Sequence, residues 1–293
     1  MRILIVATLI FGFCAPTLSA QEFSGGFRAG LNFITIDGPA EMSDDGTQTY
    51  ETFNNTTGFH VGATFALAFT DLFGLKADLM YSQKGYETVF DGPGYFYLYS
   101  NADDQEGNII FGDRQSELDV VNSYVDIPLT VYYRIGPVEL EGGVSAGLLV
   151  NSRVSGGQTF QTGVFGMDND IVFNVEGNYS RDLSGGAGII SRSTEPLPGT
   201  DVFPPSVISA YYNSNSDDNL YKRLDFGAVV GISFYLNNGL FIGGRYQHGL
   251  TDITRGENDL RTSVTDGTLE ERQFNTEDED RARSVQVSVG FRF

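Results

Sequence analysis

The feature that most restricts the fold of this 293-residue chain is a repeated alternation of apolar and polar residues in segments of about ten residues. From Phe23 to Phe33, Phe27, Ala29 and Leu31 share one face of an extended strand, while small and polar residues occupy the other face. The same period of two recurs in residues 59–69, 75–82, 121–134, 138–148, 224–234, 240–250 and 285–293. Amphipathic segments of this length are typical of strands that face lipid on one side.

The connections between these eight segments alternate between short and long. Three are tight, at residues 70–74, 135–137 and 237–239, and the last is an Asn-Gly hairpin signal. The four long connections are residues 36–57, 90–120, 155–221 and 252–280. We therefore predict an all-β fold, an eight-stranded antiparallel transmembrane β-barrel with long extracellular loops and both termini in the periplasm. A soluble sandwich or barrel is the alternative, and the glycine-rich polar faces favour the narrow interior of a closed barrel instead.

The first twenty residues are predicted to be a secretory signal peptide. A basic start precedes an apolar run from Ile3 to Phe13, and small residues lead to a cleavage site after Ala20. Eleven apolar residues are too few to span a bilayer, which argues against an uncleaved anchor. We expect residues 21–293 to form the barrel domain, with a long insertion at about 155–221. Cys14 is the only cysteine, so the mature chain contains no disulfide and no cysteine-bound zinc.

Acidic residues are concentrated in the long connections. The chain carries 38 Asp and Glu against 18 Lys and Arg, and 30 of those acids but only 6 of the bases lie in the four long connections. A net charge of −20 excludes a nucleic-acid partner, because phosphate binding needs many basic residues. An acidic extracellular surface would bind a basic envelope protein, or would bind lipopolysaccharide through bridging divalent cations. The other interpretation is that the acidic residues only keep the loops solvated.

Charged residues on the inward faces of the strands are predicted to form a polar network in the lumen. The members of this network are Arg28, Lys76, Asp78, Asp126, Arg134, Glu139, Glu141, Arg245 and Arg292, and Lys84, Arg153 and Asp225 are also expected to point inward. Eight strands leave room only for side chains or a small ligand, so a plug of ion pairs is favoured over an ion-conducting lining. Arg134 and Glu139 flank a tight turn and are expected to pair, and Pro128 is expected to mark a bulge.

Signals for catalysis or metal binding are weak. His60 is expected to face the lumen and His248 the lipid, so the two histidines do not form one site. The Gly-x-Ser-x-Gly match at residues 143–147 lies inside a predicted strand and not at a strand-to-helix turn, so it predicts no nucleophile elbow. The acidic runs 168–170 and 277–280 lack the spacing of a calcium loop. We therefore expect no catalytic residue, no metal and no cofactor.

Four sequence pieces resemble the PorT-like outer-membrane β-barrel proteins of the Bacteroidota. They are GFRAGLN at 26–32, FGLKADLMYSQKG at 73–85, YVDIPLT at 124–130 and RYQHGLTD at 245–252. The resemblance implies a barrel in the outer membrane and, for some members, a part in secretion, without a catalytic residue. The C-terminal Phe291 and Phe293 resemble the signal by which barrels are passed to the insertion machinery, so we expect them to act in assembly.

Two classes of function follow from this pattern. One is a non-enzymatic binding or scaffold barrel whose acidic loops contact a partner, and the other is a narrow pore or transporter for small solutes. The 155–221 connection is the expected recognition element, because long loops on a rigid scaffold often carry binding. We expect the fifth and sixth strands to extend beyond the membrane beneath a proline-rich cap at 195–205, with apolar contacts from Tyr211 and Tyr212.

Overall fold

The computed structural model describes residues 22–43, 45–98, 108–161, 171–179, 188–193, 207–209, 219–236, 238–263 and 273–293. The strands are β1 (Glu22–Asp37), β2 (Glu51–Asn54), β3 (Thr56–Ala68), β4 (Phe73–Leu98), β5 (Asn108–Ile135), β6 (Val138–Gln161), β7 (Ile171–Asn178), β8 (Gly188–Ser193), β9 (Val207–Ser209), β10 (Leu224–Tyr235), β11 (Leu240–Gly249) and β12 (Arg281–Arg292). Within these ranges no helix is both long and apolar enough to cross a membrane. The predicted signal peptide and the expected cap with Tyr211 and Tyr212 lie outside the described residues.

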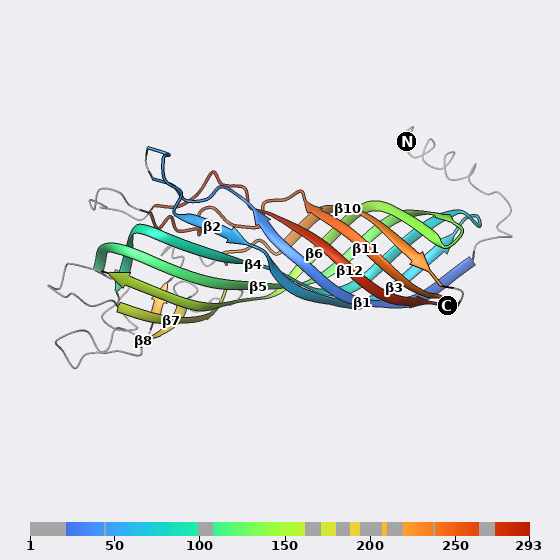
Figure 1. Ribbon diagram of the computed structural model, residues 1–293, viewed down its shortest axis with the longest axis horizontal. Coiled ribbons are helices and arrows are strands. Elements are labelled where there is room, and N and C mark those ends of the chain that lie inside the picture. Colours follow the sequence, from blue (N-terminus) through green and yellow to red (C-terminus); the bar gives the residue numbers. More distant parts are fainter. Residues whose placement is uncertain are drawn as a thin grey trace, which may run out of the picture.

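Eight of the strands close into an antiparallel barrel, which confirms the predicted fold class. The order around the ring is β1–β3–β4–β5–β6–β10–β11–β12, and β12 returns to β1 through pairs that run from Gly26–Arg292 to Asp37–Arg281. The tight hairpin turns lie at the same end as the start of β1 and the end of β12 (Figure 1). In the predicted Asn-Gly turn, Gly239 has a φ of 85°, a conformation that favours glycine.

The barrel wall has an apolar outer face and a polar inner face, as the alternation predicted. Phe27, Val144 and Val230 point outward, and each is 58% exposed. Arg28, the neighbour of Phe27, points inward and is 1% exposed. Apolar side chains exposed to this extent over a whole wall are stable only against lipid or another apolar surface.

Strands β4, β5 and β6 are much longer than the barrel requires, at 26, 28 and 24 residues. They continue beyond the ring as a twisted sheet (Figure 1). Strand β2 pairs with β4 of this sheet, and strands β7, β8 and β9 extend it in order from β6. The prediction of a long loop at 90–120 was therefore wrong, because β4 and β5 stay paired out to Leu98 and Asn108. The fifth predicted strand does extend, to Gln161, but the sixth does not, because β10 begins only at Leu224.

The sheet extension and the segments packed against it form the distal half of the molecule. We define this half as β2, β7–β9, residues 86–98, 108–120 and 154–161 of the long strands, and segments 38–50, 219–223, 250–263 and 273–280. It contains most of a hydrophobic core to which the barrel strands contribute Ile36, Tyr124 and Leu149. The core residues are Ile36, Tyr95, Leu118, Val120, Tyr124, Leu149, Val154, Val175, Tyr179, Leu220, Tyr221, Ile253 and Leu260.

A β-bulge separates the two parts of β6 and corrects two predictions. Leu149 and Asn151 pair with consecutive residues of β5, so Val150 is an extra residue that reverses the alternation. Arg153 therefore points outward and is exposed, although strict alternation predicts an inward side chain. Pro128 marks no bulge, because it pairs with Ser145 of β6 in register. The pairing between β4 and β5 has a gap at this point, but the register is the same on both sides of the gap.

Candidate functional site

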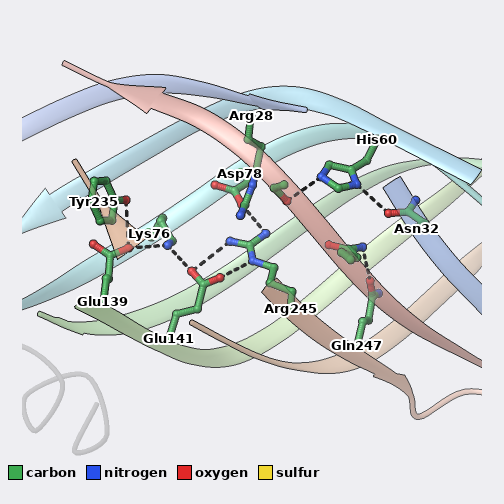
Figure 2. Close-up of polar contacts among 12 residues, drawn as sticks. Arg28, Asn32, His60, Lys76, Asp78, Glu139, Glu141, Tyr235, Arg245 and Gln247 are labelled. Atoms are coloured by element: carbon green, nitrogen blue, oxygen red, sulfur yellow. Dashed lines mark hydrogen bonds and ion pairs between the residues drawn. The ribbon is translucent and has the colours of Figure 1, made fainter. Parts of the chain in front are cut away.

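The lumen of the barrel holds a chain of buried ion pairs, which begins near the tight turns at Glu139 (Figure 2). The Glu139 carboxylate accepts hydrogen bonds from Lys76 Nζ at 2.7 Å and Arg292 Nη1 at 2.9 Å. The Tyr235 hydroxyl donates to the same carboxylate at 3.2 Å, and Arg134 Nη2 lies 3.4 Å from it. The structure thus places Arg134 and Glu139 together across their turn, with Arg134 partly exposed at the rim.

Further into the barrel, acids and bases alternate. Glu141 pairs with Lys76 and with Arg245, and Arg245 Nη1 also lies 2.6 Å from Asp78 Oδ2. Arg28 Nη1 donates to the same Asp78 oxygen at 3.0 Å. Gly231 faces this cluster, and a Cβ atom there would lie only 2.7 Å from Glu141 Oε1. The glycine therefore leaves the space in which the pair with Arg245 forms.

A second cluster occupies the distal end of the lumen. Lys84 Nζ donates to Asp126 Oδ1 and to Asp225 Oδ2, each at 3.0 Å. The same ammonium lies 4.6 Å from the centre of the Tyr124 ring, which belongs to the hydrophobic core of the distal half. Tyr124 therefore separates the charged lumen from that core. All nine lumen residues expected from the sequence lie on the inner face of the wall, whereas Arg153 does not.

The two histidines lie on opposite faces of the wall. His60 is buried in the lumen, where Nδ1 lies 2.7 Å from Asn32 Oδ1 and Nε2 lies 2.9 Å from Ser288 Oγ (Figure 2). His248 is half-buried and stacks on the lipid-facing Tyr246. His60 is held by two neutral partners, an arrangement that fixes the ring rather than offers it to a substrate.

A cavity of about 110 Å³ in the distal half was not found from the sequence. It lies between the sheet and the segments that cover it, and its lining includes Glu41, Glu51, Asp259, Asp280 and Arg114. The guanidinium of Arg114 packs over Phe90, with Cζ 4.9 Å from the ring centre. Its Nε has no hydrogen-bond partner in the described part of the chain. Only the tertiary structure brings these residues together, since they come from segments more than 200 residues apart.

The carboxyl groups around this cavity are poorly solvated. Burial and the neighbouring Glu41 raise the pKa of Glu51 to about 7. Burial raises the pKa of Asp280 to about 6 and also raises the pKa of Asp259 well above its usual range. Carboxyl groups with raised pKa values that line a cavity can exchange protons near neutral pH. The described residues contain no cluster of three or more His, Cys, Asp or Glu side chains arranged to hold a metal ion.

The opposite face of the distal sheet carries an open groove of about 550 Å³. It runs across β4, β5, β6 and β7, and its acidic lining comes from Asp91, Glu117 and Asp119. Asn174 and Thr159 add neutral polar groups. The outer face of the distal sheet is therefore polar and acidic, while the outer face of the barrel is apolar.

The C-terminal residues close the barrel. Phe293 exchanges two backbone hydrogen bonds with Gly25, at 3.2 Å and 2.9 Å, and its side chain is 77% exposed. Phe291 pairs with Phe27 of β1, and the two rings stack with centres 6.2 Å apart. An exposed aromatic side chain on an edge strand is available to another protein until the ring has closed. The assembly role of Phe291 and Phe293 stays a prediction.

The fold thus defines a closed β-barrel with a lipid-facing wall. The family model described as "Outer membrane protein beta-barrel domain" matches residues 19–255. The chain belongs to this family and is a protein of the bacterial outer membrane. No curated protein matches the chain at a significant level.

Several solved barrels are similar to this chain at low identity. Ail of Yersinia pestis, solved with the heparin analogue sucrose octasulfate, is 12% identical with a TM-score of 0.35, over 93% of this chain and 99% of that one. OprG of Pseudomonas aeruginosa is 11% identical with a TM-score of 0.35, over 93% and 97%. The protease OmpT of Escherichia coli is 10% identical with a TM-score of 0.35, over 94% and 99%. Similarity at this level transfers no function to this chain.

Proposed function

We propose that this protein is a non-enzymatic binding barrel whose distal half docks a positively charged partner at the cell surface. The observation that carries the proposal is the acidic outer face of the distal sheet, where Asp91, Glu117 and Asp119 line the groove. Asp113 is exposed on the same face of β5. Fixed negative charges on a rigid sheet attract and orient a basic partner more than they attract neutral solutes.

The filled lumen supports binding over solute transport. A solute that crossed the barrel would have to separate Lys76 from Glu139 and Glu141, and Lys84 from Asp126 and Asp225. Separation of buried charge pairs is costly, because each ion would lose its partner without regaining water. The alternative of a narrow pore therefore requires a rearranged lumen.

The expected orientation places the distal half outside the cell and both ends of the barrel domain in the periplasm. The tight turns and the long extensions lie at opposite ends of the barrel, which is the asymmetry of outer-membrane barrels (Figure 1). The PorT-like sequence pieces favour a partner in a secretion apparatus. Protease treatment of intact cells should cut within 155–221 and 252–280, and cleavage confined to residues 70–74, 135–137 and 237–239 would reverse this orientation.

Partner binding is tested by neutralising the groove. The variant Asp91→Asn, Glu117→Gln and Asp119→Asn should lose salt-sensitive binding of a fluorescent lysine-rich peptide and of basic envelope proteins recovered by crosslinking. A matched control removes three exposed acids elsewhere, with Glu22→Gln, Asp45→Asn and Asp71→Asn. Equal loss in both variants would show a general charge effect and would contradict a docking site in the groove.

Conductance distinguishes the two classes of function. The purified protein in a planar lipid bilayer should give no steady ohmic current. Steady current that changes when Lys84→Gln alters the distal cluster would support the pore instead.

A further inference from the structure

Four arginines with exposed or partly exposed side chains lie directly beyond the lipid-facing band, at the distal ends of the barrel parts of β6, β10 and β12. On β6, the exposed Val150 is followed by the exposed Arg153. Ahead of β10, the exposed Arg223 directly precedes the lipid-facing Leu224. We call Arg153, Arg223, Arg281 and Arg283 the arginine flank.

The third strand of the flank is β12. Arg281 and Arg283 continue the outward face on which Val285 contacts lipid, and both arginine side chains are about 40% exposed. Strands β6, β10, β11 and β12 are consecutive in the ring, so the four arginines occupy one continuous side of the barrel.

The corresponding positions on the neighbouring strands β4 and β5 carry no arginine. Beyond the lipid-facing Tyr81 of β4, the outward residues are Gln83, Gly85 and Glu87. Beyond Val121 of β5 the first outward residue is Asp119. The rim of the barrel is therefore acidic on β4 and β5 and basic on β6, β10 and β12.

We propose that the arginine flank binds the phosphate groups of lipid A, the membrane-embedded part of lipopolysaccharide. The exposed apolar residues next to each arginine lie among acyl chains, which places the guanidinium groups at the level of the lipid head groups. Guanidinium groups bind phosphate through paired hydrogen bonds, and their aliphatic stems remain over the apolar wall.

The present partners of these arginines leave them available to phosphate. Arg153 and Arg223 form no ion pair with any residue in the described ranges. Arg283 pairs with Asp37 and Arg281 pairs with Glu279, but both acids are exposed, at 49% and 64% of their side chains. Exposed pairs contribute little, so a doubly charged phosphate monoester can replace the carboxylates.

The test measures binding of the purified protein in nanodiscs to lipid A with both phosphates and to the same lipid A after removal of the phosphates. EDTA is present throughout, so that binding through bridging divalent cations is excluded. We expect the wild-type protein to prefer the phosphorylated lipid, and the variant with all four arginines changed to Gln should lose about tenfold or more in affinity for it. The variant with all four changed to Lys should retain most of the preference. Unchanged heat-modifiable gel mobility would show that each variant is folded.

Two further arms identify the site and the source of the phosphate. The variant Glu87→Gln and Asp119→Asn alters the acidic side and should not weaken binding. Inorganic phosphate at millimolar concentration should not compete. The proposal is overturned if the wild-type protein shows no phosphate preference, if the Gln variant keeps it, if the acidic-side variant loses it equally, or if inorganic phosphate displaces the lipid. Because lipid A is supplied in vitro, a failure here is independent of partner binding in the acidic groove.

Discussion

The barrel half and the distal half share three continuous strands but have opposite polarity. On β5, Ile127 points outward at 50% exposure while Asp126 points into the lumen and is fully buried. Farther along the same strand, Glu117 points outward and is exposed while Leu118 points inward at 7% exposure. One strand thus follows the pattern of a membrane protein and then that of a water-soluble protein, because the medium around its outer face changes from lipid to water.

The reversal occurs at a layer of tyrosines. Tyr124 contacts Lys84 of the lumen and also packs in the distal core. Tyr221 belongs to the same core and Tyr86 packs against it, with their hydroxyl oxygens 2.6 Å apart. A tyrosine suits such a boundary because its ring is apolar and its hydroxyl can satisfy a polar neighbour. The comparison therefore predicts that equivalent substitutions in the two halves have different costs.

Loss of Glu139 from the lumen should have the largest effect. Glu139→Ala would leave Lys76 and Arg292 buried without their shared carboxylate, at a cost of about 3–5 kcal/mol in the free energy of unfolding. Urea unfolding in lipid vesicles would measure this loss. The control Glu117→Ala removes an exposed acid of the distal half and should change stability by less than about 0.5 kcal/mol. Similar costs for both variants would contradict the assigned polarity of the lumen.

Substitution of an outward-facing residue by arginine should reduce the free energy of unfolding only in the barrel half. Val230 points outward at 58% exposure, and Val230→Arg would place a charge among acyl chains at a cost of about 2–4 kcal/mol. Asn174→Arg on the outer face of the distal sheet should be neutral within about 0.5 kcal/mol. Insertion yield and urea midpoints in vesicles would measure the difference. A neutral Val230→Arg would show that this face does not contact lipid.

A cavity in the distal core should have a smaller and local effect. Leu118→Ala removes a buried side chain beside the existing cavity and should cost about 2 kcal/mol. Hydrogen exchange should become faster in segments 250–263 and 273–280, while peptides from β10, β11 and the barrel part of β12 stay protected. Uniformly faster exchange in both halves would mean that they unfold as one unit.

The barrel could be predicted from the sequence because lipid imposes a strict alternation on every strand. Residues such as Phe27 and Arg28 follow that rule directly, and the tight turns then set the antiparallel order. Arg153 could not be placed correctly, because the extra Val150 in β6 reverses the alternation without a Gly or Pro to signal it.

The distal half could not be predicted in the same way. Gly92, Pro93 and Gly94 are turn residues by composition, yet they lie inside β4 and pair with β5. Long-range pairing outweighs local propensity in such a strand. The cavity around Arg114 was also missed, because its lining residues meet only after the separate segments have packed.

The smallest predicted effect is a pH dependence confined to the distal half. Burial and nearby acids raise the pKa of Glu51 to about 7 and of Asp280 to about 6 in the folded protein, above their ordinary values of 4.5 and 3.8. Between pH 4 and 7 the folded state therefore binds more protons than the unfolded state, so the free energy of unfolding falls as pH rises through this window. Hydrogen exchange, corrected for intrinsic rates, should show the distal half better protected at pH 5 than at pH 8. Glu51→Gln removes one of the carboxyl groups with a raised pKa and should reduce this difference. Protection that increases from pH 5 to pH 8 would show that these carboxyl groups gain stabilising partners when they ionise.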